Sequence, residues 1–398
     1  MTGSFEVGHI FGIRIALDWS VAIIFLLVLF QLGAVLFPYW HPDWPPVLIW
    51  SVALGTALVF FVSILVHELA HALVGKAYGM RVRSITLFIF GGIANIERDP
   101  PSAKAEVMMA IVGPITSFVM GVVFIVLAAW FSNSAWMSAE NPMEAIGNLG
   151  PVATLLAWVG PINILLAVFN MIPGFPLDGG RVLRGLLWWL TGNLVRATRI
   201  AATAGQVLAW SLILAGLAMA FGVPVPFFGR GLAGGLWLVL IGWFLSAAAR
   251  ASYQQVLVDR LLEDVQVRDL MLSHPQIVSP EMTVQNLVDR YMMRSDQRAF
   301  PVVDEDRLLG LVCLEDVRRL SRGMWEKKRV SEIMTPAGRI ETVEPDDGAV
   351  EAVRRLSRLD VAQIPVVERG RLVGLFRRQD FMRWIELSAT RDWEHKTA

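Results

Sequence analysis

The sequence predicts a polytopic α-helical membrane protein with about six transmembrane helices, followed by a soluble α+β domain built from a tandem repeat. Of its 398 residues, 55% are apolar and only 18% are charged, and the apolar residues gather in long runs that suit a bilayer. After Arg250 the composition changes to mixed charge with short apolar runs, and the pattern around Phe300 recurs around Ile364. We therefore expect a membrane domain over residues 1–250 and a soluble domain over residues 251–398.

Six apolar segments are long enough to cross a bilayer, which requires about 20 residues per helix. Short loops rich in proline, glycine and charge separate them. The expected helices cover residues 19–38, 50–76, 104–131, 152–173, 200–222 and 231–249. The first apolar run lacks a basic flank followed by a small-residue cleavage site, so we expect it to be retained as a span and not removed as a signal peptide.

Positive charge in the short loops predicts the orientation, because cytoplasmic loops carry an excess of lysine and arginine. The loops after the second and fourth helices are basic, whereas the stretch Phe131–Pro151 has no lysine or arginine. The basic residues of those two loops are Lys76, Arg81, Arg83, Arg98, Lys104, Arg181, Arg184, Arg196 and Arg199. We expect a multi-pass protein of the cell membrane with both termini in the cytoplasm.

Composition also excludes several classes of function. The net charge is zero and no block of lysine and arginine is present, so we expect no nucleic-acid partner. The single cysteine, Cys313, excludes an internal disulfide and a zinc site ligated by cysteines.

The second apolar segment contains the pattern His-Glu-x-x-His. His67 and His71 are one helical turn apart and face the same way, at the separation that two imidazoles need to bind one Zn²⁺. Glu68 lies beside them and could take a proton from the attacking water. The alternative is a chance match, but three ionisable groups in lipid are costly unless they are paired or bind a metal.

Two histidines leave a catalytic zinc one protein ligand short. At the end of the fourth segment, the stretch Asn170–Arg181 contains two prolines and three glycines, which should break the helix at membrane depth. Asp178 at this break could point inward as the third ligand. The alternative is a turn that ends the helix, with Asp178 as a capping residue.

Together these motifs resemble the site-2 protease family of intramembrane zinc metalloproteases. The match consists of His67-Glu68-x-x-His71 in one span and Asn170-x-x-Pro173-x-x-Pro176-Leu177-Asp178-Gly179 in a later one. The resemblance covers roughly residues 8–250. It implies a zinc metalloendopeptidase with one Zn²⁺ per chain that hydrolyses peptide bonds in transmembrane segments. Its substrates would be membrane-anchored regulators such as an anti-sigma factor or a membrane-tethered transcription factor.

The same resemblance suggests residues that bind the substrate. Asn170 matches a family asparagine that binds the substrate or the oxyanion, although it could equally be a polar contact between spans. Gly91 and Gly92 end the alternating stretch 83–90, which could be a re-entrant strand whose free edge pairs with an unwound substrate or an interfacial hairpin. Asp18 replaces a histidine that the family often has before the first span, and no role is transferred to it.

The repeats, at about 262–322 and 328–390, resemble a pair of CBS domains, a module that in many proteins binds adenine nucleotides. In that family a Gly-h-h-Ser/Thr-x-x-Asp run places a hydroxyl near phosphate and the aspartate on the ribose. Asp316 and Asp380 occupy the ribose positions, and the hydroxyl positions hold Cys313 and Arg377. Arg377 could pair with phosphate. The resemblance implies ATP, ADP or AMP as a ligand, and a structural or dimerising role, as in a homodimer through these domains, stays open.

Two other classes of function compete with the protease. CBS pairs regulate several membrane transport proteins, and broken helices also suit a transporter or channel, but no inverted repeat is visible among the six spans. A catalytically inactive scaffold is disfavoured because all three candidate ligands and Glu68 are present.

Overall fold

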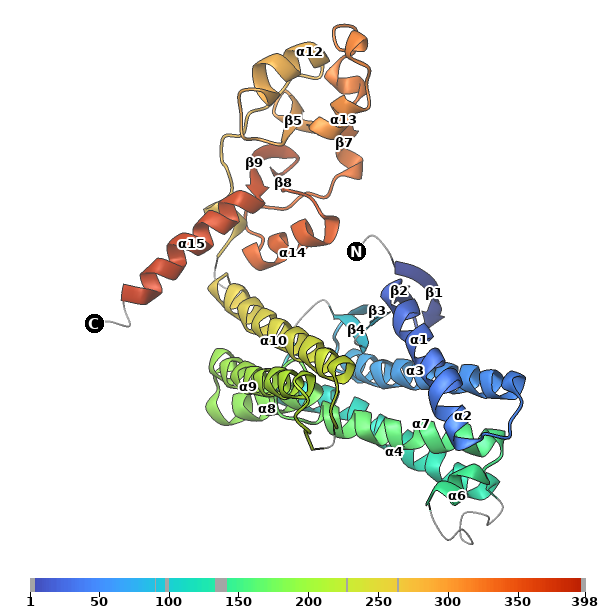
Figure 1. Ribbon diagram of the computed structural model, residues 1–398. Coiled ribbons are helices and arrows are strands. Elements are labelled where there is room, and N and C mark those ends of the chain that lie inside the picture. The colour runs from blue at the N-terminus through green and yellow to red at the C-terminus, as the bar shows by residue number, and fades with distance from the viewer. Residues whose placement is uncertain are drawn as a thin grey trace. The chain divides into compact units, whose positions relative to one another are not determined.

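The computed structural model describes residues 4–89, 91–96, 100–132, 142–226, 228–262 and 265–394. Contacts divide the chain into two compact units, Met1–Gln254 and Gln255–Ala398. Long helices dominate the first unit, and the second alternates short strands with short helices (Figure 1).

Within the described residues, six helices are long and apolar enough to cross a membrane, as predicted. The first of these spans is composite, because α1 continues through a π-helical stretch, η1, into α2. A short helix, α6 (Pro142–Gly147), precedes the fourth span. The spanning elements are α1 (Ser20–Phe30), η1 (Gln31–Leu36), α2 (Phe37–Trp40), α3 (Pro46–Ala77), α4 (Ala103–Phe131), α7 (Pro151–Asn170), α9 (Leu194–Ala220) and α10 (Leu232–Leu261).

Some helix boundaries differ from the prediction. The last span was expected to end at residue 249, but α10 continues to Leu261, because residues 250–261 contain no glycine or proline to end the helix. An additional helix, α8 (Asp178–Thr191), lies between the fourth and fifth spans and ends at Gly192 in the left-handed conformation. Next to it, the Asn193 side chain accepts a hydrogen bond from the Arg196 amide and starts α9 earlier than predicted.

A four-stranded sheet lies beside α3. Its strands are β1 (Ser4–Ile10), β2 (Ile13–Asp18), β3 (Val82–Phe88) and β4 (Gly91–Ile96), in the order β1-β2-β3-β4. Buried residues such as Ile13, Ile15 and Ile85 form a core with Ala72 of α3. The alternatives for stretch 83–90 were a strand with a free edge and a hairpin. Strand β3 pairs with β2 on one side and forms a hairpin with β4 on the other, so its own edges are both occupied. The edge strands of the sheet are β1 and β4.

Helix α4 is central to the first unit, since it packs against α3, α7 and α8. Glycines allow two close helix crossings: Gly121 of α4 faces the Gly160 carbonyl of α7, and Gly216 of α9 faces the Gly235 carbonyl of α10. In Figure 1, α4 and α7 run side by side.

The second unit contains the predicted repeat. Hairpin β5–β6 pairs Pro301 with Leu311, and hairpin β8–β9 pairs Pro365 with Leu375 in the equivalent register. The strands are β5 (Ala299–Asp304), β6 (Arg307–Cys313), β7 (Thr335–Pro336), β8 (Gln363–Glu368) and β9 (Arg371–Arg377), with sheet order β5-β6-β9-β8 and β7 on β6. The helices are α11 (Val267–Leu270), α12 (Val284–Leu287), α13 (Leu314–Arg318), α14 (Ala349–Leu359) and α15 (Arg378–Glu394). Shorter π and 3₁₀ stretches cover Val288–Met292, Arg322–Met324, Val330–Glu332 and Ala337–Arg339.

Each repeat begins with a short leading segment, Val267–Leu270 or Val330–Glu332, and the two segments are exchanged. Val267 and Leu270 are buried in the core that contains Ile364 and Phe376 of the second repeat. Val330 is buried in the core of the first repeat. Each core is therefore completed by the leading segment of the other repeat.

Candidate metal centre

Helix α3 presents two buried imidazoles to one point. His67 and His71 are 4% and 6% exposed, and their Nε2 atoms are 3.1 Å apart. Four residues advance a helix by slightly more than one turn, so the two side chains leave the same face of α3.

Asp178 reaches the same point from a distant part of the sequence. It is the first residue of α8, where a carboxylate is favoured by the helix dipole, and its Oδ2 atom lies 3.2 Å from Nε2 of each histidine. The broken segment before it is tightly packed. The Phe175 amide donates to the Ala201 carbonyl of α9, and Gly179 lies so close to the Met171 backbone that no Cβ fits there.

The hydrogen bonds behind the histidines fix which nitrogen is available. His71 Nδ1 lies 2.6 Å from the Met109 carbonyl oxygen, which can only accept, so Nδ1 carries the proton and Nε2 presents a lone pair. His67 Nδ1 is 2.9 Å from the Ser117 hydroxyl, which can hold it in the same state. The lone pairs of the two Nε2 atoms and the Asp178 carboxylate therefore face one another.

This set of donors fits zinc. Two imidazole nitrogens and one carboxylate oxygen form a common protein ligand set of catalytic zinc sites. Tetrahedral bonds of about 2.0 to 2.1 Å place ligand atoms about 3.3 Å apart, and the three separations here are 3.1, 3.2 and 3.2 Å. Among the described residues, His67, His71 and Asp178 are the group of this kind that could hold a metal ion.

Glu68 lies between the ligand cluster and the sheet. Its carboxyl group packs against Gly92 of β4 so closely that a Cβ at position 92 would overlap it. Glu68 also interacts electrostatically with His67, His71 and Asp178. The structure thus places a carboxyl group beside both the candidate ligands and strand β4.

The predicted substrate residues lie in two places. Gly91 and Gly92 are the first two residues of β4, at the edge of the sheet. Asn170 is the last residue of α7 and is half-buried. The side chain of Asn170 has no hydrogen-bond partner within the described ranges, so the structure does not bring it together with the metal ligands through a direct bond.

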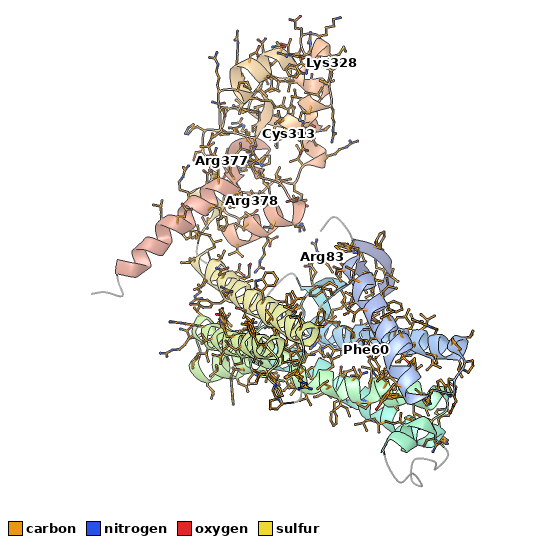
Figure 2. All side chains as sticks on the ribbon, viewed as in Figure 1. Phe60, Arg83, Cys313, Lys328, Arg377 and Arg378 are labelled. Carbon is orange, nitrogen blue, oxygen red and sulfur yellow. The ribbon has the colours of Figure 1, made fainter. Side chains whose placement is uncertain are left out.

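The predicted nucleotide residues are engaged with near neighbours. The Asp316 carboxylate accepts from the Cys313 amide at 2.9 Å and lies 3.0 Å from the Cys313 sulfur. Asp380 accepts two hydrogen bonds from the Arg377 guanidinium, at 2.6 and 2.8 Å. These bonds raise the pKa of Arg377 above its usual value. Figure 2 labels Cys313 and Arg377 in the second unit.

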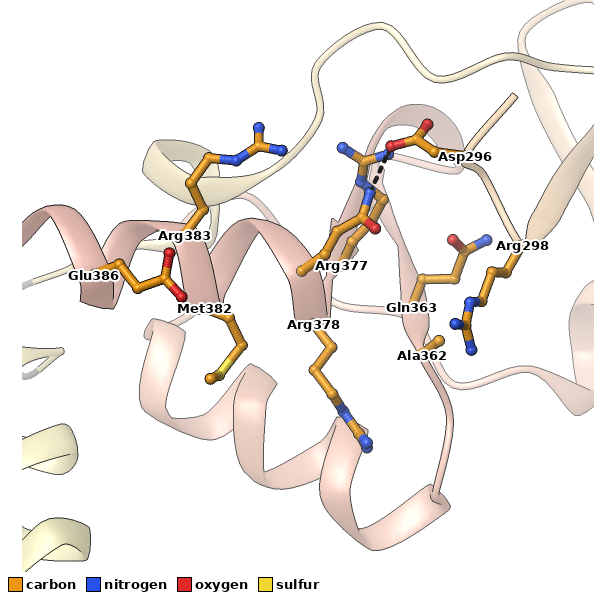
Figure 3. A pocket seen from close by; sticks show the side chains of 10 residues that line it. Asp296, Arg298, Ala362, Gln363, Arg377, Arg378, Met382, Arg383 and Glu386 are labelled. Carbon is orange, nitrogen blue, oxygen red and sulfur yellow. Dashed lines mark hydrogen bonds and ion pairs between the residues drawn. The ribbon is translucent and has the colours of Figure 1, made fainter. Parts of the chain in front are cut away.

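A pocket of about 490 Å³ adjoins Arg377. Figure 3 shows its lining, which is rich in arginine and comes from both repeats. The lining residues are Asp296, Arg298, Ala362, Gln363, Arg377, Arg378, Gln379, Met382, Arg383 and Glu386. Sequence reasoning missed Arg298, Arg378 and Arg383. The signal for one of them was the Arg377-Arg378 pair just before a predicted helix.

Comparisons with known proteins identify the family. Residues 55–214 match the model of peptidase family M50, and residues 267–323 and 330–387 match the CBS domain model. The chain is 33% identical over 389 residues to the protein of Mycobacterium tuberculosis named zinc metalloprotease Rip3, covering 97% of this chain and 94% of Rip3. The chain belongs to peptidase family M50, the site-2 protease family. This M50 protein is a multi-pass zinc metalloprotease with a pair of CBS domains.

Two further similarities were found for this M50 protein. It is 30% identical to a protein of Synechocystis named zinc metalloprotease sll0528, covering 98% of this chain and 97% of that protein. Among solved structures, the site-2 protease from Methanocaldococcus jannaschii is 28% identical, with a TM-score of 0.40, covering 63% of this chain and 95% of that chain.

Proposed function

We propose that this protein hydrolyses peptide bonds within transmembrane segments of membrane-anchored regulatory proteins, such as an anti-sigma factor or a membrane-tethered transcription factor. One Zn²⁺ would be held by His67, His71 and Asp178. The observation that carries the proposal is the meeting of three ligand atoms, from two buried histidines and a half-buried aspartate, within 3.2 Å of one another, with Glu68 next to them.

When bound, zinc supplies Lewis acidity, which polarises a carbonyl and lowers the pKa of water. Glu68 takes a proton from the attacking water as the water oxygen bonds to the carbonyl carbon. It then gives this proton to the amide nitrogen as the carbon–nitrogen bond breaks. Ser117 and the Met109 carbonyl hold the imidazoles in orientation throughout.

Strand β4 suits the presentation of the substrate. A transmembrane helix hides its peptide bonds in internal hydrogen bonds, and an unwound segment needs replacement partners. The edge of β4 offers backbone groups beside Glu68, and an extended peptide can pair with such an edge. We assign Gly91 and Gly92 to this contact, because small residues let the peptide approach, and Asn170 to the scissile carbonyl oxygen.

Loop charge supports an orientation with both termini in the cytoplasm. Lys76 lies in the last turn of α3, shortly after His71, and Arg181 lies in the first turn of α8, shortly after Asp178. Cytoplasmic loops are enriched in such basic residues. Residues 1–250 would then form the catalytic domain in the membrane. Residues 251–398, with repeats at about 262–322 and 328–390, would form a cytoplasmic CBS pair able to dimerise.

We also propose that the arginine-lined pocket binds the phosphates of ATP, ADP or AMP and thereby regulates the protease. Its volume is in the range of small-ligand sites. Arg377 and Asp380 neutralise each other, which leaves Arg298 and Arg378 to meet phosphate. In calorimetry with ATP, we expect Arg378→Ala to weaken binding about tenfold or more, because bonds to charged groups contribute about 1.5 to 3 kcal/mol. Arg339→Ala, on an exposed residue outside the pocket, is the control.

The protease proposal is tested by measuring zinc content and cleavage of an unstable transmembrane peptide together. We expect the unaltered protein to hold about one zinc and to cleave. Glu68→Gln should keep the metal and lose activity by roughly 10² to 10⁴-fold, whereas Asp178→Ala should lose the metal. Cleavage by Glu68→Gln at the normal rate, or a zinc-free active protein, would show that the mechanism is wrong.

A further inference from the structure

One face of α4 contacts every candidate metal ligand or the element that holds it. The residues concerned are spaced three and four apart, at positions 106, 109, 113 and 117, so they share this face. The Met109 carbonyl meets His71, and Ser117 meets His67. Gly113 leaves room for both imidazoles, since a Cβ there would overlap them. Of these four residues, Glu106 is the one whose partner is Arg184 of α8 and not a histidine.

Glu106 forms a buried ion pair with Arg184 of α8. Glu106 is fully buried and Arg184 is 5% exposed, and the Nε and Nη2 atoms of Arg184 both reach Glu106 Oε1. The pair is reinforced by close packing between the two helices, because Gly185 faces Val107 and the Ala103 carbonyl with no room for a Cβ.

Arg184 also holds the segment before the ligand. Its guanidinium carbon lies 5.2 Å from the centre of the Phe175 ring, within the range of a cation–π contact. Phe175 precedes Asp178 by three residues, and Arg184 follows it by six on the same helix. The Arg184 side chain thus connects the helix that follows the third ligand with the segment that precedes it.

We infer that Glu106 and Arg184 are a positioning pair that sets where Asp178 meets the two histidines, and so controls zinc affinity. The inference rests on the zinc site proposed above. His67 and His71 take their orientation from α4, and Asp178 is part of α8. Because the ion pair anchors α8 to the same face of α4, it fixes the positions of the three ligands relative to one another. Supporting groups of this kind typically change metal affinity about 10- to 100-fold when they are removed.

The test measures zinc affinity by competition with a chelator in the full-length protein, together with the thermal midpoint of the metal-free protein. We expect Glu106→Gln to weaken zinc binding about 10- to 100-fold, and Glu106→Asp, which keeps the charge, to weaken it less. Thr154→Val is the matched control, because it breaks another buried polar pair, between Thr154 and His41, away from the ligands. It should lower the thermal midpoint and leave zinc affinity unchanged.

A second variant applies if Glu106→Gln does not fold. Phe175→Leu keeps the ion pair and an apolar side chain but removes the ring beneath the guanidinium, and it should weaken zinc binding about threefold to tenfold. Normal zinc affinity in the folded Glu106 and Phe175 variants would overturn the inference and leave the pair with a purely structural role. Absence of zinc binding in the unaltered protein would instead overturn the proposed metal site.

Discussion

At Gly113 and Gly92 the metal centre depends on the absence of a side chain. Gly113 of α4 lies against both imidazoles, and Gly92 of β4 lies against the Glu68 carboxyl group. In each case a Cβ would occupy space that a chemical group already fills. The two glycines serve different groups, so substituting them should separate metal binding from proton transfer.

Gly113→Ala should impair metal binding. The methyl group would push His67 and His71 away from Asp178, with an overpacking cost of about 1 to 3 kcal/mol, and zinc affinity should fall about 10- to 100-fold. Metal analysis after dialysis against a weak chelator measures this. Gly150→Ala is the control, since open space surrounds that position. Full zinc content in Gly113→Ala would mean that α4 can move away from the histidines.

Gly92→Ala should impair catalysis and spare the metal. The new methyl group would displace Glu68, the proposed proton carrier, and the three atoms nearest to it all belong to Glu68 and not to the imidazoles. We expect a rate of peptide cleavage reduced by about 10²-fold or more, with zinc content unchanged. The measurement is single-turnover cleavage at saturating zinc. Equal loss of zinc and activity would argue against this separation.

The reactivity of the single cysteine, Cys313, provides a test of the structure of the second unit. Burial, together with the hydrogen bond to Asp316, raises the pKa of the Cys313 thiol. A raised pKa leaves less thiolate at pH 8, so Cys313 should react with iodoacetamide more slowly in the folded protein than in urea. The reaction should accelerate as the pH rises toward the raised pKa. Rates in the folded protein equal to those in urea would contradict the buried, hydrogen-bonded thiol.

At the scale of elements, close helix crossings hold the membrane unit together. In lipid the helices gain little from apolar contact alone, so small residues that let backbones approach are favoured at their crossings. Gly216 and Gly235 make such a crossing between α9 and α10, where each faces the backbone carbonyl of the other.

Neighbouring glycines of α10 allow a matched test of this crossing. At Gly235 an added methyl group would meet the Gly216 carbonyl, whereas at Gly234 it would meet only the flexible tip of Met219. We expect Gly235→Ala to lower the thermal midpoint by several degrees, since overpacking costs about 1 to 3 kcal/mol. Gly234→Ala should leave it unchanged or raise it, because alanine favours a helix. The reverse order would show that α9 and α10 are not held by this contact.

The elements also show what the sequence could predict. Apolar length located the six spans, because lipid imposes that length on every spanning helix. The choice between a free edge and a hairpin for stretch 83–90 stayed open, because the parallel pairing of β3 with β2 joins segments 70 residues apart. Likewise, the spacing of His67 and His71 within one helix predicted that their side chains face the same way, and their Nε2 atoms are 3.1 Å apart. The pairing of Glu106 with Arg184 depends on how α4 packs on α8, which no local pattern encodes.

At the scale of the whole molecule, the two sequence repeats of the second unit do not coincide with its two packed cores. Similarity between the copies predicted two α+β units of the same kind, and their hairpins have equivalent registers. It could not predict that the leading segments are exchanged, since similarity does not say which copy a segment packs on. Val330 thus belongs to the second repeat in sequence and to the first in packing.

This exchange predicts which fragments fold. A fragment of residues 274–340 contains the whole first core, including Val278 and Val330, whereas the sequence repeat 267–323 lacks Val330. Domains of about 60 residues have little stability to spare. We expect the longer fragment to unfold cooperatively on heating, followed by circular dichroism, and the shorter one to show no transition. Equal behaviour of the two would mean that the leading segment adds little.

The exchange of the leading segments also affects the order in which buried side chains meet their partners during synthesis. Val267 and Leu270 leave the ribosome about 70 residues before Val343, the first buried residue of the remaining core that they complete. At a translation rate of about 5 to 20 residues per second, roughly 4 to 14 s pass before the partners of these apolar side chains are synthesised. During that interval they are exposed while the first core closes around Val330. The order of translation thus makes the segment Val267–Leu270 the last part of the first repeat to be buried.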